Sequence, residues 1–216
     1  MARTGISTRP MRRLVTIGTP AVLIVVSLFH PSRLISQFSP TVFEFLRQQV
    51  FVWLAVHVVQ LFLIGPLGLT VWYLTEGLEG RFARASRAAL IPFLVFYSAL
   101  DSIVGIGTGM LVWQSLDFTG QQRAVAEQVI QRFYDSQFDP FPGLVILIGA
   151  IAWIVVCTGA GVALWRAGES RWVVVLMVLA GVLFGIYHPF PTGTVAMFCL
   201  LATVIMRERH LRTAGS

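Results

Sequence analysis

The chain contains no lysine: all 16 of its basic residues are arginine, set against 10 acidic residues. Without a lysine amine, it cannot form a Schiff base with retinal or pyridoxal and cannot supply the lysine of a nucleotide-binding P-loop. Arginine-only usage is typical of a GC-rich genome and favours a bacterial source.

Charge of either sign is scarce. Charged residues make up 12% of the chain, whereas a soluble domain has about 25%. Hydrophobic residues make up 56%, and the mean hydropathy is +0.77. The charges stand at the ends of long apolar runs rather than on one basic face, so the net charge of +6 does not indicate a nucleic-acid partner. The predicted partner is the lipid bilayer.

Motifs for thiol, zinc and hydrolase chemistry are also missing. Cys157 and Cys199 both lie in apolar runs, and there is no C-x-x-C pair. Neither G-x-S-x-G nor H-E-x-x-H occurs, and no two histidines stand four residues apart. These absences lean against an enzyme, and no cofactor is required by the sequence.

Long apolar runs dominate what is present. A membrane-crossing helix needs about 20 residues, and the runs that approach or exceed this length are Leu14–Phe29, Val50–Leu74, Ala88–Trp113, Phe141–Trp165, Trp172–Tyr187 and Phe190–Met206. Pro189 and Pro191 separate the last two runs and predict a tight hairpin. The first run lacks an A-x-A cleavage site, so we expect it to be retained. The predicted fold is a single all-α membrane domain over residues 1–216, a six-transmembrane-helix bundle.

The arginines predict its orientation. With six spans, twelve arginines fall on one side and four on the other. Cytoplasmic loops carry the excess of basic residues. We therefore predict that both termini are cytoplasmic, in a multi-pass protein of the bacterial plasma (inner) membrane. Trp153 lies in mid-span, away from the interfacial aromatics, and is expected to pack inside the bundle.

Two outer connections carry local signals. Thr41 and Glu44 have capping-box spacing, which predicts a helix that runs into the second span. The segment 121–134 is amphipathic, with Val125, Val129, Ile130 and Phe133 on one face. Within the outer loop 114–140, this helix is expected either to lie on the membrane surface or to cover the bundle as a lid.

Small residues recur at four-residue spacing, at Gly105 and Gly109 and again at Gly181 and Gly185. This spacing lets helix backbones approach closely. The faces serve packing within the chain or, as the alternative, a homo-oligomer or a larger membrane complex.

Asp101 is the most informative single residue. It lies in the middle of an uncharged apolar run, where an ionised group costs about 2.5–3.5 kcal/mol on insertion scales. Interhelical polar contacts return only about 0.6 kcal/mol on average. His57 and Gln60 share a face of the preceding span at a similar depth, and Ser98 neighbours Asp101 on its own helix. These four residues form the predicted ligand- or proton-binding site, in the outer half of the bundle.

Three functional hypotheses follow. The first is a small transporter-like or ligand-binding membrane protein centred on Asp101, His57 and Gln60. The alternative is a haem- or metal-binding membrane subunit that uses His57 with His188 or His30, all three of which lie in the outer half. A further alternative is a non-catalytic structural subunit of a larger membrane complex.

Overall fold

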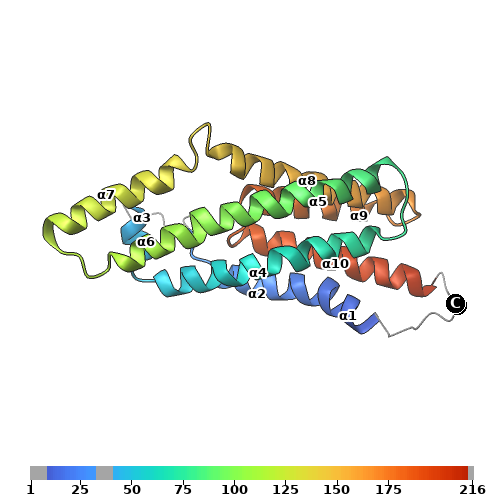
Figure 1. The fold of residues 1–216 in the computed structure, drawn as a ribbon. Coiled ribbons are helices and arrows are strands. Elements are labelled where there is room, and N and C mark those ends of the chain that lie inside the picture. Colours follow the sequence, from blue (N-terminus) through green and yellow to red (C-terminus); the bar gives the residue numbers. More distant parts are fainter. Residues whose placement is uncertain (1–8, 33–40, 214–216) are drawn as a thin grey trace, which may run out of the picture.

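The computed structural model describes residues 9–32 and 41–213, and within these ranges the chain forms helices and no strand. The long helices lie side by side along one long axis (Figure 1). In chain order they are α1 (Arg9–Arg13), π-helix η1 (Leu14–Gly18), α2 (Thr19–Phe29), α3 (Val42–Leu46), α4 (Val50–Thr75), α5 (Arg81–Leu100), π-helix η2 (Asp101–Gly107), α6 (Thr108–Gln114), α7 (Gly120–Ser136), α8 (Gly143–Arg166), α9 (Trp172–Ile186) and α10 (Thr192–Thr213). The predicted all-α class is confirmed.

Helices of membrane-spanning length and composition are present. In the described part of the chain, four are long and apolar enough to cross a bilayer: Pro10–Phe29, Val50–Thr75, Arg81–Gln114 and Gly143–Arg166. The apolar helix α9 is shorter, and α10 continues past its apolar part into a charged end. The fold is thus that of a membrane-embedded helical bundle.

The third span differs from its predicted limits. The sequence predicts that this span begins at Ala88, but α5 already begins at Arg81. Gly77 and Gly80 adopt positive φ angles of 75° and 98°, which confine the reversal after α4 to a few residues. The continuous helix from Arg81 to Gln114 has 34 residues, or about 51 Å at 1.5 Å per residue. It therefore extends well beyond a hydrocarbon core of about 30 Å.

The main hydrophobic core lies among α2, α4, α5, α8, α9 and α10. Trp153 is fully buried there, as predicted, and its Nε1 donates a hydrogen bond of 3.2 Å to the carbonyl of Ala180. A Cβ atom at Gly181 would lie 3.0 Å from Cys157 Cβ, and one at Gly109 would lie 2.6 Å from a methyl carbon of Leu54. These glycines serve close packing within the chain.

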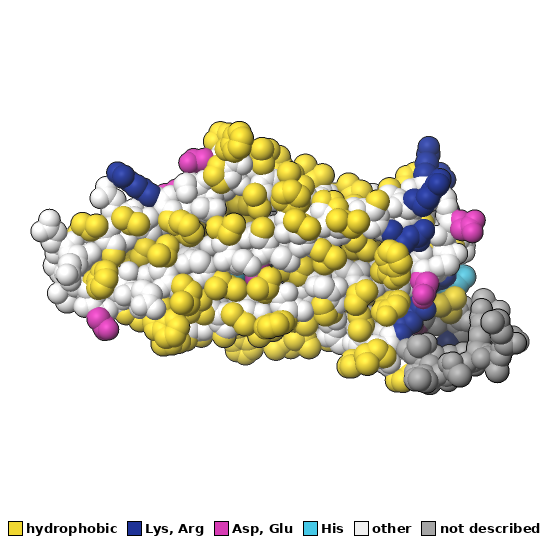
Figure 2. All heavy atoms as spheres, viewed as in Figure 1, with side chains coloured by type: hydrophobic (Ala, Val, Ile, Leu, Met, Phe, Trp, Pro, Cys, Tyr) yellow, Lys and Arg dark blue, Asp and Glu magenta, His cyan; other side chains and the backbone are white. Residues whose placement is uncertain are grey.

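One end of the bundle is rich in arginine, and ion pairs join its segments. Arg12 pairs with Glu76 at 2.8 Å, and Arg207 pairs with Glu169 at 2.9 Å. The first helix, the α4–α5 and α8–α9 connections and the last helix therefore meet here. Arginine side chains gather at this end of the visible face (Figure 2). Of the arginines used to predict topology, Arg3 and Arg33 lie outside the described residues.

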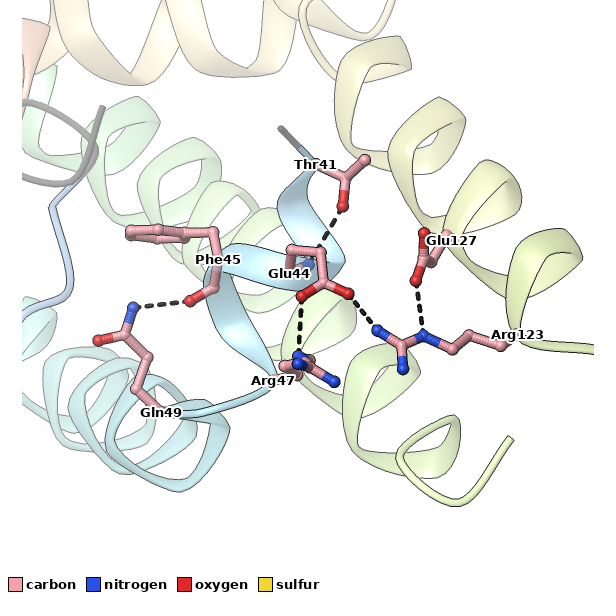
Figure 3. A network of polar contacts seen from close by, with 7 residues as sticks. All are labelled: Thr41, Glu44, Phe45, Arg47, Gln49, Arg123 and Glu127. Carbon is pink, nitrogen blue, oxygen red and sulfur yellow. Dashed lines mark hydrogen bonds and ion pairs between the residues drawn. The ribbon is translucent and has the colours of Figure 1, made fainter. Parts of the chain in front are cut away.

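The opposite end is built by α3, α6 and α7. The α3 helix is capped as predicted, because the Glu44 amide donates to Thr41 Oγ1 at 3.1 Å. The carboxylate of Glu44 does not complete the capping box but pairs with Arg47 and Arg123, and Arg123 also pairs with Glu127 of α7 (Figure 3). This network ties α3 to α7. The prediction that one helix runs from here into the second span is wrong, since α3 ends at Leu46 and α4 begins at Val50.

The α7 helix returns beside α3 and α6 and packs on them through one part of its predicted apolar face. Ile130 is buried, and Phe133 approaches Gly107 of η2. Val125 and Val129 are exposed. The helix therefore covers this end of the bundle, while part of its apolar face remains open.

Candidate functional site

Three of the four histidines meet between the helices. His30 follows the last residue of α2, His57 lies two turns into α4, and His188 follows α9. The centroid of the His30 ring lies 4.8 Å from that of His57 and 5.1 Å from that of His188. One ring nitrogen from each histidine lies within 4.8 Å of the other two. We refer to these three residues as the histidine cluster.

A His-Pro dipeptide follows two of the contributing helices. His30 precedes Pro31, and His188 precedes Pro189. A residue before proline is disfavoured in the α conformation, and His30 is accordingly extended, with φ −69° and ψ 117°. The chain thus leaves α2 at His30, whereas α9 ends at Ile186 and the chain is already extended at Tyr187, the residue before His188.

Backbone carbonyls fix the proton on two of the rings. His57 Nδ1 lies 2.7 Å from the carbonyl oxygen of Trp53, and His30 Nδ1 lies 2.9 Å from that of Pro31. A carbonyl only accepts, so each Nδ1 carries the donated hydrogen and each Nε2 keeps its lone pair. The Nε2 atoms of His30 and His188 are buried and have no hydrogen-bond partner in the described structure. Such backbone contacts orient metal-ligating imidazoles.

The His57 ring rests on a bare stretch of backbone. A Cβ atom at Gly105 would lie 1.9 Å from His57 Cδ2, so no side chain fits at that position. Gly105 belongs to η2, and its carbonyl accepts a hydrogen bond of 2.6 Å from Trp53 Nε1. Single-turn π segments within α-helices occur often at functional sites. Here the Gly105 carbonyl accepts from both the Thr108 amide and the Trp53 indole, and it thereby fixes the indole next to His57.

A cavity of about 150 Å³ adjoins the histidine cluster. Apolar side chains form most of its wall, and Tyr97, Tyr134, Tyr187 and Asp101 supply the further polar groups. The apolar lining residues include Val42, Phe45, Leu46, Leu100, Val104, Phe138 and Ile146. Residues of α3 and Tyr134 of α7 form part of this wall. The end of the bundle that is built by α3, α6 and α7, here called the α3–α7 end, therefore covers the cavity on one side.

Asp101 lines the same cavity as the histidines. Its side chain is only 2% exposed, and its Oδ2 has no hydrogen-bond partner among the described residues. It does not belong to the group of mutually close ligand atoms. Gln60 is buried and its Oε1 is likewise unpaired, yet neither Gln60 nor Ser98 lines the cavity. Of the four residues in the predicted polar site, the cavity therefore brings together His57 and Asp101.

The donor set fits a transition-metal ion. Imidazole nitrogens suit zinc, copper, iron and nickel, and a bond of about 2.0–2.1 Å to each would bring the nitrogens to about 3.3 Å from one another in a tetrahedral site. The ligand atoms of the cluster lie within 4.8 Å of one another, so binding would need them to close by up to about 1.5 Å. A haem group does not fit, because an apolar cavity of about 150 Å³ holds a molecule the size of benzene.

His210 lies apart from the cluster, on α10 at the arginine-rich end, with its Nδ1 4.0 Å from Glu169. Sequence reasoning did not identify Trp53, Tyr97 or Gly105 as site residues. The one available signal was the His-Pro pair shared by His30 and His188 at the ends of two apolar runs. No protein-family model, curated protein or solved structure matched the chain.

Proposed function

We propose that this chain is a multi-pass membrane protein that binds one transition-metal ion through His30, His57 and His188. The observation that carries the proposal is the meeting of these three side chains, from three separate elements, with ligand nitrogens within 4.8 Å of one another. Two of the rings are held by backbone carbonyls in the tautomer that metal ligation requires. Three imidazole nitrogen donors favour zinc or copper over magnesium or calcium, which prefer oxygen ligands.

The proposal includes six spans with both termini in the cytoplasm of a bacterial cell and the chain in its plasma membrane. Its support is the excess of arginine at one end of the bundle and the ion pairs that join the first and last helices to the connections there. In this orientation the histidine cluster occupies the outer half of the bilayer. The metal would then be reached from outside the cell.

The test is the metal content of protein purified in detergent. We expect one zinc or copper ion per chain after loading and dialysis, measured by plasma mass spectrometry. His57→Gln and His188→Gln remove one nitrogen ligand each and should lower the metal affinity by at least tenfold.

His210→Gln is the matched control, because it removes a histidine that is remote from the cluster. It should retain the full metal content. Equal losses of metal in His210→Gln and His57→Gln, or a wild-type protein that retains no metal, would contradict the proposal.

A transporter-like function is the second candidate, and the observation that favours it is the place of Asp101 in the wall of the histidine cavity. Intramembrane carboxylates and histidines mark ion and proton pathways. On this hypothesis the metal is cargo and passes Asp101. Proteoliposomes should take up ⁶⁵Zn²⁺, and Asp101→Asn should abolish uptake while binding persists. Uptake no faster than in protein-free liposomes contradicts transport and leaves binding intact.

A further inference from the structure

We propose that the histidine-bound metal carries a water molecule as its remaining ligand, and that Asp101 is the positioning residue that holds this water. The inference rests on the proposed function, because it assigns the coordination position that three histidines leave open. In zinc sites with three protein ligands, a water or a substrate fills the fourth position.

Charge balance is the first argument. Three neutral imidazoles leave a divalent ion with its full charge in an apolar surrounding, and a buried charge is costly unless it is paired. Among the side chains that line the cavity, Asp101 is the carboxylate. An ionised Asp101 is itself a buried charge of the opposite sign, since it is 2% exposed and its Oδ2 has no partner in the described part of the chain. A metal ion in the histidine cluster would bring the two opposite charges close together, which lowers the free-energy cost of burying each of them.

Geometry assigns Asp101 to the outer sphere of the metal. Its oxygens are not part of the group of mutually close ligand atoms, although it shares the cavity. Asp101 opens η2, one turn before Gly105, on which the His57 ring rests. A molecule bound to the metal on this side therefore lies between the ion and Asp101.

The carboxylate then determines what kind of ligand fits there. An ionised carboxylate only accepts hydrogen bonds, so the ligand must present a proton to it. Water satisfies this requirement and its oxygen binds the metal at the same time. An anion such as azide would meet the negative charge of Asp101. The cavity of about 150 Å³ has room for water in this position, since one water occupies about 30 Å³ of liquid volume.

The first experiment uses the unaltered protein loaded with Cu²⁺. Electron paramagnetic resonance should show hyperfine coupling to the imidazole nitrogens, which tests the metal site itself. Proton double resonance should show a strongly coupled proton that disappears on exchange into D₂O, the signature of a bound water. Nitrogen coupling without an exchangeable proton overturns the inference and leaves the metal site standing.

The second experiment tests Asp101 through azide binding to the Cu²⁺-loaded protein, followed by its charge-transfer absorbance. Asp101→Asn removes the repulsion and should raise azide affinity by about tenfold or more, a modest fraction of the Coulomb energy of two nearby charges. Cu²⁺ affinity should fall by about 10–100-fold, as for other outer-sphere partners, with the stoichiometry unchanged at saturation. Asp101→Ser makes the same charge change and serves where the asparagine variant does not fold.

Gln60→Ala is the control, because it alters a buried polar side chain outside the cavity and should leave azide affinity at the wild-type value. Equal azide affinity in wild type and in both Asp101 variants, including no binding in any of them, overturns the role of Asp101. Loss of all Cu²⁺ from Asp101→Asn would instead make Asp101 a direct ligand, which also contradicts the inference.

Discussion

The orientation of the His57 imidazole is determined by its immediate neighbours. The carbonyl of Trp53 holds its Nδ1, the indole of the same residue lies against its ring, and Gly105 provides the backbone surface beneath it. His30 adds an edge-to-face contact at 4.8 Å between ring centroids. A ring held in this way has few rotamers to lose when it binds a ligand.

Trp53→Phe tests this arrangement at the residue scale. The change keeps an aromatic ring but removes Nε1, so the carbonyl of Gly105 loses one of its two donors and keeps the Thr108 amide. We expect a loss of about 0.5–1.5 kcal/mol in stability and weaker metal binding, measured by thermal unfolding in detergent and by calorimetric titration.

Trp72→Phe is the matched variant, near the far end of the same helix, where the indole is exposed. It should alter neither quantity by much. If Trp53→Phe behaves like Trp72→Phe, the hydrogen bond to Gly105 has no part in the site.

The third span shows how an element shapes the site. It is α-helical on both sides of η2, and the wider π turn between Asp101 and Gly107 presents Asp101, Val104 and Gly105 to the same cavity. Gly109, one turn further, permits close approach of Leu54 on α4. This stretch therefore brings its backbone close to α4 at the level of His57.

Gly105→Ala is the prediction at the element scale. The new Cβ atom would lie 1.9 Å from His57 Cδ2, so the imidazole must move away. Metal affinity should fall at least as far as in His57→Gln, while the protein still folds. Titration of the purified variant with Zn²⁺ against a fluorescent chelator measures this.

Gly65→Ala is its control, because a Cβ atom there meets nothing within 4 Å. It should retain wild-type affinity, and alanine should slightly favour the helix. Unchanged affinity in Gly105→Ala would show that His57 does not bind metal in the position described.

Element positions were largely predictable from hydropathy. The predicted starts of the second and fifth spans, at Val50 and Trp172, agree with α4 and α9. The early start of α5 at Arg81 was missed because arginines in that turn resemble a loop, although Ala83 and Ser86 there are buried. No residue pattern distinguishes the two π segments from the α-helices that they interrupt, so the sequence predicted neither of them.

At the scale of the whole molecule, the cavity lies where two hydrophobic clusters meet. Tyr97 belongs to the main core, whereas Val42, Phe45 and Leu46 belong to the smaller core of the α3–α7 end. All four line the cavity. The helices α3 and α7 therefore contribute to the cavity wall, and the Glu44–Arg123 pair joins them (Figure 3).

The proposed topology predicts which ends face the cell exterior. Glu79→Cys and Ser170→Cys at the arginine-rich end should be protected from a membrane-impermeant maleimide in intact cells, whereas Asp139→Cys should react. The background would be Cys157→Ala with Cys199→Ala. If only one of Glu79→Cys and Ser170→Cys is labelled, the six-span arrangement is contradicted. If both are labelled from outside, the orientation is the opposite of the one proposed.

The candidate site was only partly visible in the sequence. Asp101 and His57 could be singled out because polar residues in apolar spans are rare. Their distances to His30 and His188 depend on the order in which helices pack, which hydropathy does not determine. Gln60 shares the predicted face with His57, yet it lies outside the cavity. Depth along a helix was thus predictable, whereas lateral neighbours were not.

X-ray absorption spectroscopy of the purified, zinc-loaded protein tests the central claim most directly. The account predicts about three imidazole nitrogens at about 2.0–2.1 Å and one further light atom, with no sulfur at about 2.3 Å. The outer-shell scattering typical of histidine should weaken in His188→Gln and stay unchanged in His210→Gln. A zinc ion with one imidazole or none, or bound through sulfur, would contradict the three-histidine site.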